Sequence, residues 1–330
     1  MTGVLREFDR RRFHPREFGH RLFVAPRAAW PLAIARVVIG VAVLLWTVTM
    51  AFDASALLGD DALVGPEFAD LNRYLPLDST LSVGIALVAL AVVSVAIIVG
   101  WRPSLLLVAI QRRNTMTLNS GDIILRDLTL LLALTPTGAA MSVDQVRRHG
   151  RGTFWTSEQI APWGLRIVQL QMMVVYFFAF WSKSGELWMN GTAVSTAFRL
   201  RDLQRVGEWS VLVDNIWVVA FLTWSTLAVE LALGTMLWVK RFRPTLIVLG
   251  ILLHVLIDTF VLVGFFGVAM IAGLMTFLDA DRIDEAVRGR AAARLPDPTG
   301  SAEPAQTDGV VGSRNPTSAP PVGDPRPERD

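Results

Sequence analysis

Residues 30–52 read WPLAIARVVIGVAVLLWTVTMAF, an unbroken apolar run whose only charged side chain is Arg36. A hydrocarbon core about 30 Å thick is crossed by about 20 consecutive apolar residues in a helix. This run therefore predicts a membrane-spanning helix. Four further runs of the same kind lie at 80–101, 162–183, 214–239 and 245–263. Together they predict an all-α fold, a polytopic integral membrane bundle of helices.

The composition agrees with a membrane protein. Of the 330 residues, 52% are hydrophobic and 18% are charged, and the mean hydropathy is +0.45. An average soluble domain has roughly 25% charged residues, so an ordinary soluble enzyme is excluded. The net charge of +2 gives no reason to expect nucleic acid as a partner. Without cysteine there is no thiolate chemistry or disulfide, and with only His254 in an apolar segment a metal site is weakly supported.

Three shorter apolar pieces complete the pattern, at 104–110, 123–136 and 265–278. With the five long runs they make about eight hydrophobic segments, and their length suggests short, tilted or re-entrant helices. Broken helices are tolerated at membrane depth where protein or a polar cavity satisfies the backbone. We therefore expect these pieces to border a site.

Basic residues predict the orientation in a cell membrane. Residues 1–29 hold seven arginines with regularly spaced phenylalanines, which favours a basic cytoplasmic segment at the membrane surface. More basic residues follow Trp101 and lie at 240–243, whereas 53–79 has only Arg73. The positive-inside rule then places both termini in the cytoplasm, on either side of a membrane domain at 30–279. Residues 285–330 lack aromatic side chains and contain many prolines, so we expect a disordered cytoplasmic tail.

Ionisable groups inside apolar segments are costly and usually face the bundle interior. The spacing of four residues allows Asp122 to form an ion pair with Arg126. Alternatively, the residues from Asn119 to Asp122 form a turn that lines a cavity. The same spacing lets Asp258 orient the ring of His254 through a hydrogen bond. Other groups of this kind are Arg36, Asp127, Arg166, Lys183 and Glu230.

The segment 162–183 carries one polar face. Gln169, Tyr176 and Lys183 recur every seven residues, with Arg166 beside them. Lys183 is either an anchor at a helix end or a desolvated amine that can act as a base. Glu230, in the middle of 214–239, needs a partner, which we expect to be Arg36, Arg166 or Lys183.

Several stretches resemble the HTTM domain (horizontally transferred transmembrane domain), the membrane module of vitamin K-dependent gamma-carboxylase and of many bacterial proteins. The most specific are RIVQLQ at 166–171, YFFAFWSK at 176–183 and WMNGTA at 188–193, supported by RVVIG at 36–40, NSGD at 119–122, Glu230 and His254. The resemblance implies a helical membrane protein that deprotonates a reduced quinone and adds oxygen to it. It also implies that Lys183 is the activating base.

Two departures from the carboxylase set a limit on the resemblance. Ser120 follows Asn119 where the carboxylase has a histidine, and the chain runs into the proline-rich tail where the carboxylase has a large lumenal domain. We therefore do not expect carboxylation of protein glutamate residues.

Two hypotheses follow. The first is a quinone- or lipid-linked enzyme, a quinone-dependent oxygenase or carboxylase-like lyase, with menaquinol or a similar lipid-like molecule as its cofactor. Its candidate catalytic residues are Lys183, His254 and Glu230, and its candidate substrate-binding residues are Arg166, Gln169, Tyr176, Asn119, Asp122 and Trp188. The second is a non-catalytic membrane subunit or small-molecule carrier whose buried charges form structural pairs. Apart from the lipid bilayer, the sequence names no partner.

Overall fold

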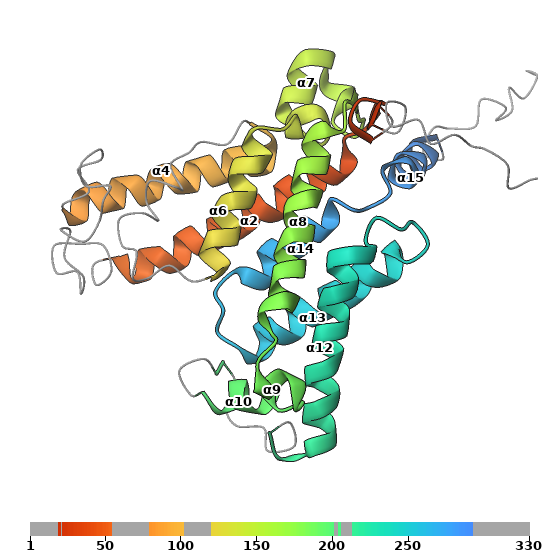
Figure 1. Ribbon diagram of the computed structural model, residues 1–330. Coiled ribbons are helices and arrows are strands. Elements are labelled where there is room, and N and C mark those ends of the chain that lie inside the picture. The colour runs from red at the N-terminus through yellow and green to blue at the C-terminus, as the bar shows by residue number, and fades with distance from the viewer. Residues whose placement is uncertain are drawn as a thin grey trace, which may run out of the picture.

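The computed structural model describes residues 19–20, 22–54, 79–101, 120–200, 204–205 and 213–292. Five helices in this part of the chain are long and apolar enough to span a membrane, as the sequence predicted, and they dominate the ribbon in Figure 1. They are α2 (Trp30–Phe52), α4 (Thr80–Val99), α8 (Trp163–Ser182), α12 (Ile216–Met236) and α13 (Arg243–Phe260). The chain is thus a multi-pass, all-α membrane protein.

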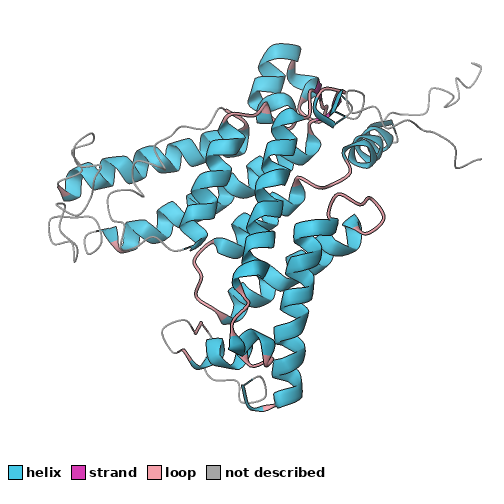
Figure 2. Cartoon of the chain, in the orientation of Figure 1, coloured by secondary structure: helices cyan, strands magenta, loops and turns pink. Residues whose placement is uncertain are grey.

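Shorter elements connect and cover these spans, and strand structure is almost absent from the described residues (Figure 2). The helices are α6 (Ser120–Ala133), α7 (Val143–His149), α9 (Glu186–Met189), α10 (Ala193–Arg199), α14 (Phe266–Met275) and α15 (Ala280–Ala292), with 3₁₀ turns η4 (Thr137–Ala139) and η5 (Arg151–Thr153). The strands β1 (Arg27–Ala28) and β2 (Gln159–Ile160) pair antiparallel, with Arg27 opposite Ile160.

Local sequence explains where the long helices begin and end. The Ser79 side chain accepts a hydrogen bond from the Ser82 N–H in a capping box at the start of α4, and Gly100 ends that helix in the left-handed conformation. Asn215 caps α12 through its side chain. Gly264, with φ of 65°, separates α13 from α14. These local signals set the lengths of the spans.

The helix α14 lies at the centre of the fold. Although it has only ten residues, it contacts α2, α6, α8 and α13. Gly273 permits this close packing, because a β-carbon there would overlap the side chain of Met172 on α8. The short piece predicted at 265–278 is therefore a buried core helix, and it joins the α2–α4–α6 group to the α12–α13 pair (Figure 1).

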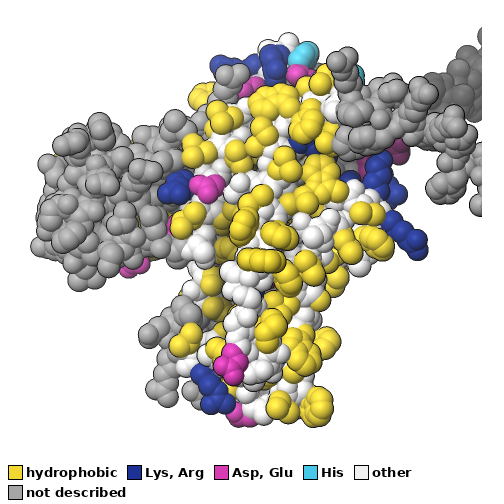
Figure 3. Space-filling model, viewed as in Figure 1, with side chains coloured by type: hydrophobic (Ala, Val, Ile, Leu, Met, Phe, Trp, Pro, Cys, Tyr) yellow, Lys and Arg dark blue, Asp and Glu magenta, His cyan; other side chains and the backbone are white. Residues whose placement is uncertain are grey.

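The outer faces of the long helices are apolar. Val88, Phe178 and Phe221 are each more than half exposed. Hydrophobic side chains cover much of the flank in Figure 3, while charged side chains gather toward the ends. This distribution fits contact with lipid on the flanks.

Two expectations about the segments outside the membrane need correction. Residues 285–292 belong to α15, so the proposed disordered tail does not begin at Glu285, and residues 293–330 lie outside the described part. Ala28 and Ala29 are buried in a small core with Trp30 and Ala280, so the last residues of 1–29 pack against protein. The rest of that segment up to residue 18 is not described.

Candidate functional site

The polar face of α8 points into the bundle, as its spacing predicted. Arg166, Gln169 and Tyr176 are all buried, and Lys183, which follows the last residue of the helix, is half-buried. At 1.5 Å rise per residue, Arg166 and Lys183 are about 25 Å apart. The candidate residues on α8 are therefore divided between the two ends of this helix.

At the C-terminal end of α8, Lys183 forms an ion pair with Glu230 of α12. The ammonium Nζ lies 2.8 Å from both carboxylate oxygens and 3.1 Å from the Ala179 carbonyl, so its three hydrogens all have acceptors. Trp188 of α9 adds a cation–π contact, with Nζ 5.4 Å from the ring centroid. Of the three partners expected for Glu230, the structure selects Lys183.

A second polar contact lies beside this pair. The Tyr176 hydroxyl is 2.9 Å from Nε2 of His254 on α13, and Phe266 packs edge-to-face on the imidazole. His254 is 2% exposed, and its Nδ1 has no hydrogen-bond partner among the described residues. A buried polar atom without a partner costs about 1–3 kcal/mol. Nδ1 is thus an unused hydrogen-bonding atom inside the bundle.

The expected hydrogen bond between His254 and Asp258 is wrong. Neither His254 Nδ1 nor Asp258 Oδ1 is bonded within the described chain. The Asp258 carboxylate instead lies against Gly267, where a β-carbon would overlap it. A spacing of four residues puts two side chains on one face of a helix, but rotamers and neighbouring helices decide whether they meet.

We call Tyr176, Lys183, Glu230 and His254 the lysine cluster. They come from α8, α12 and α13, and they lie close enough for Glu230 to act electrostatically on Tyr176 and for Lys183 to act on His254. Two hydrogen-bonding systems thus lie near each other, one joining Lys183 to Glu230 and one joining Tyr176 to His254. The arrangement can exchange a proton within the Lys183–Glu230 pair and can accept a ligand atom at His254 Nδ1.

Arg166 and Gln169 form a separate network. The guanidinium donates to Gln169 Oε1 at 2.6 Å and to the Leu22 carbonyl at 3.1 Å, and it stacks over Trp238. Gln169 donates in turn to the Thr276 carbonyl at 2.7 Å. These bonds tie α8 to α14 and to the N-terminal segment.

Asp122 also lies apart from the lysine cluster. It is buried in the first turn of α6 and accepts a hydrogen bond of 2.7 Å from Trp46 Nε1 of α2. Arg126 is 3.4 Å from its neighbour Asp127. The helix begins at Ser120, so residues 120–122 are helical and do not form the suggested turn, while Asn119 lies outside the described residues.

Arg36 has a role that the sequence did not reveal. It is fully buried and donates to the carbonyls of Thr137 at 2.5 Å, Ala140 at 3.2 Å and Met141 at 2.5 Å. Its position inside an apolar run indicated an interior partner. Nothing in the sequence indicated that the partner would be a backbone turn about a hundred residues further along the chain.

A pocket of about 790 Å³ lies at the other end of α8, between α4, α6 and α7. None of the four residues of the lysine cluster lines it. Within the described residues, no group of three or more His, Asp or Glu side chains is arranged to hold a metal ion.

Comparison with known proteins gives one match. The family model of the HTTM domain matches residues 25–281, which is most of the chain. No curated protein and no solved structure matches.

Proposed function

Since this chain belongs to the HTTM domain family and spans the membrane several times, we propose that it binds a reduced quinone or a quinone-like lipid at the lysine cluster. In this proposal the Lys183–Glu230 pair takes up the proton that such a molecule releases. The observation that carries it is the Lys183–Glu230 pair beside a buried histidine whose Nδ1 is unused.

The residues of the cluster suit a molecule with a polar oxygen on an aromatic ring. His254 Nδ1 would hydrogen-bond to that oxygen, and Trp188 and Phe266 would offer ring surfaces to the aromatic part. A reduced quinone supplies an acidic hydroxyl group and two reducing electrons. The apolar helices around the cluster would exclude water from the site.

The proton balance of the pair decides which group is the base. The three acceptors around Lys183 Nζ suit an ammonium group, which has no lone pair and cannot accept a proton. The proposal therefore requires one proton to pass from Lys183 to Glu230, which leaves a neutral amine beside a neutral acid. The neutral amine is then the general base.

The alternative is a non-catalytic membrane subunit or carrier in which Lys183 and Glu230 only join α8 to α12. The saturation of the ammonium by three acceptors favours this alternative. The two functions differ in whether an arginine can replace Lys183, because arginine keeps the charge and does not deprotonate in proteins.

The chain has only two lysines, so Lys240→Arg is a matched control for Lys183→Arg. Wild type and both variants would be purified in mild detergent and assayed for bound quinone by mass spectrometry and for oxygen uptake dependent on reduced quinone. We expect bound quinone in all three. Oxygen uptake should fall by about 10²-fold or more in Lys183→Arg, the usual size of a lost general base, and stay within about twofold in Lys240→Arg.

Full oxygen uptake by the Lys183→Arg protein would refute the role of Lys183 as a general base. Wild-type protein without bound quinone and without oxygen uptake would establish the structural alternative. In that case Lys183→Met should destabilise the protein, because it leaves Glu230 buried and unpaired, and Lys183→Met with Glu230→Gln should recover part of the loss.

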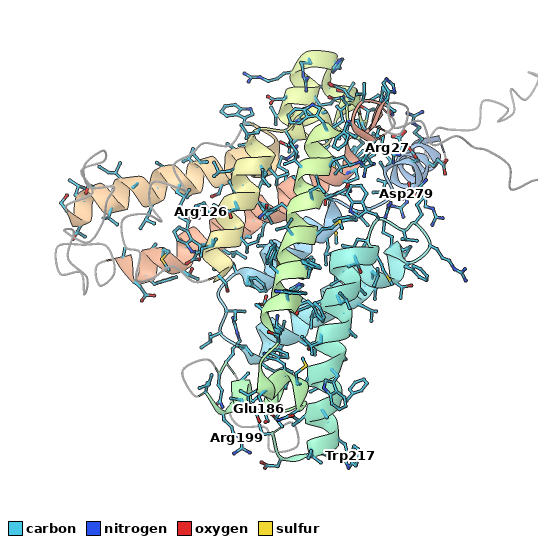
Figure 4. The ribbon with its side chains drawn as sticks, in the orientation of Figure 1. Arg27, Arg126, Glu186, Arg199, Trp217 and Asp279 are labelled. Atoms are coloured by element: carbon cyan, nitrogen blue, oxygen red, sulfur yellow. The ribbon has the colours of Figure 1, made fainter. Side chains whose placement is uncertain are left out.

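The charge distribution supports an orientation with both termini in the cytoplasm. Arg147, Arg148 and Arg151 lie in and beside α7, and Arg243 interacts electrostatically with Arg27 and Asp279. Figure 4 places Arg27 and Asp279 toward this end, which we call the α7 end, and Glu186, Arg199 and Trp217 at the other. The excess of basic residues favours the α7 end as the cytoplasmic one.

A further inference from the structure

The pocket at the α7 end has exposed apolar side chains in its wall. Its wall includes Trp101 after α4, Leu134 after α6 and Trp163 at the start of α8. These side chains are 49%, 72% and 44% exposed. Tryptophans with a free face are typical of the boundary between hydrocarbon and headgroups. The pocket therefore lies at headgroup depth and has an apolar wall on the lipid side.

The inner wall of the pocket is rigid. The turn η4 forms part of it through Thr137 and Ala139. Arg36 holds this turn through bonds to the carbonyl of Thr137, its first residue, and to those of Ala140 and Met141, which follow it. A wall fixed by a fully buried guanidinium is a preformed surface rather than a gap between loose loops.

The charged residues that line the pocket are balanced in sign. They are Arg147, Arg148, Asp144 and Glu158. The guanidinium of Arg148 already has partners within the protein, because it lies 3.4 Å from the Glu158 carboxylate and donates to the Gly138 carbonyl at 3.0 Å. Glu158 is in ion-pair contact with Arg148 and lies 3.5 Å from His149, although its buried Oε1 accepts no hydrogen bond within the described chain. Two of the four charges are thus used within the protein.

The other two charged residues, Arg147 and Asp144, are available to bind a ligand. Within the described chain the guanidinium of Arg147 makes a cation–π contact with Trp101, at 5.6 Å, and no hydrogen bond, and the Asp144 carboxylate accepts none. The residues are three apart on α7, so both lie on the same face. The pocket therefore offers one cation and one anion, close together, beside an apolar wall.

We propose that this pocket binds one zwitterionic phospholipid with a primary ammonium group, as in phosphatidylethanolamine. The phosphate is bound by Arg147, the ammonium group donates to Asp144, and an acyl chain runs along Leu134 and Trp163. An anionic lipid without the ammonium group would leave Asp144 unpaired and be repelled by it. A choline headgroup has no N–H to donate to the carboxylate.

The test uses the full-length protein in mild detergent, with bound lipid counted by native mass spectrometry after delipidation and titration with phosphatidylethanolamine, phosphatidylglycerol or phosphatidylcholine. We expect one bound phosphatidylethanolamine, at an affinity at least tenfold above that for the other two lipids. Arg147→Gln and Asp144→Asn should each lower that affinity about tenfold. Arg151→Gln, which removes the same charge from a residue outside the pocket, should change it less than twofold.

Equal binding of the three lipids by the wild type would overturn the proposal, and this comparison does not depend on any variant folding. An Arg147→Gln protein that binds lipid as well as Arg151→Gln would also overturn it. The outcome does not depend on the lysine cluster, because the two sites share no residue.

Discussion

At the scale of single residues, a guanidinium buried in a membrane helix needs hydrogen-bond acceptors, and for Arg36 these are carbonyl oxygens of one backbone turn. It bonds to the carbonyls of Thr137, Ala140 and Met141. Met141 has a φ of 46°, an unusual conformation for a residue with a side chain. Arg36 therefore stabilises both the turn and its strained end.

We expect Arg36→Met to lower the free energy of unfolding by at least about 2 kcal/mol, since it leaves several buried carbonyls without a donor. Arg126→Met is the matched control, because Arg126 is partly exposed and its ion pair among the described residues is with its neighbour Asp127. It should cost less than about 1 kcal/mol. Denaturation midpoints of the two variants in the same detergent measure the difference, and equal midpoints would contradict the role of Arg36.

The sequence predicted which residues are buried better than it predicted their partners. Arg36, Glu230 and His254 lie in the interior because an ionisable group in lipid is costly. The partners come from other helices, 47 residues apart for Lys183 and Glu230 and 78 for Tyr176 and His254. Spacing along one helix carries no information on such contacts between helices.

At the scale of elements, glycines set where helices stop. Gly191 ends the short helical segment after α8 with a φ of 71°, and a β-carbon there would lie 3.3 Å from the ring of Trp224. The Trp-x-x-Gly spacing of the sequence thus has a backbone reason. The turn brings Trp188 over Lys183, and α10 packs on α12 and against α9.

Gly191→Ala should therefore destabilise the protein by about 1–2 kcal/mol, the cost of a left-handed residue with a side chain. Gly185→Ala is its control, because Gly185 has a φ of −73° and open space around it. That change should cost less than about 1 kcal/mol. Apparent melting temperatures in detergent compare the two, and a Gly191→Ala protein as stable as the control would show that the turn tolerates a side chain.

Helix α15 shows what a search for apolar runs misses. Its sequence is charged, yet Ile283 and Val287 pack on the small core around Trp30, and Asp284 accepts a hydrogen bond from the indole. Two signals were present in the sequence. Asp279 caps the helix, and the apolar residues recur at a helical spacing.

At the scale of the whole molecule, the five long spans were predictable because each is long and apolar enough by itself. Their arrangement was not, because the central position of α14 depends on Gly273, which allows close packing against α8. The piece expected at 104–110 lies outside the described residues. Hydropathy predicts that a segment enters the membrane, and side-chain shape decides which segments touch.

The proposed orientation predicts that reporters fused after residues 65 and 290 lie on opposite sides of the membrane. Residue 290 is in α15 at the α7 end, and residue 65 follows α2 and precedes α4 in the sequence. A cytoplasmic reporter should be active only at 290 and an external reporter only at 65. Activity of one reporter at both sites would contradict the topology.

Arg36 and Arg166 also bear on how the bundle responds to membrane voltage. Both guanidiniums are held by carbonyl and amide oxygens, and among the described residues neither has a carboxylate within salt-bridge distance. Moving one elementary charge across the bilayer against 100 mV costs about 2.3 kcal/mol. With the α7 end in the cytoplasm, both charges already lie toward the negative pole of an energised membrane, so the resting potential reinforces the orientation that the arginine clusters favour.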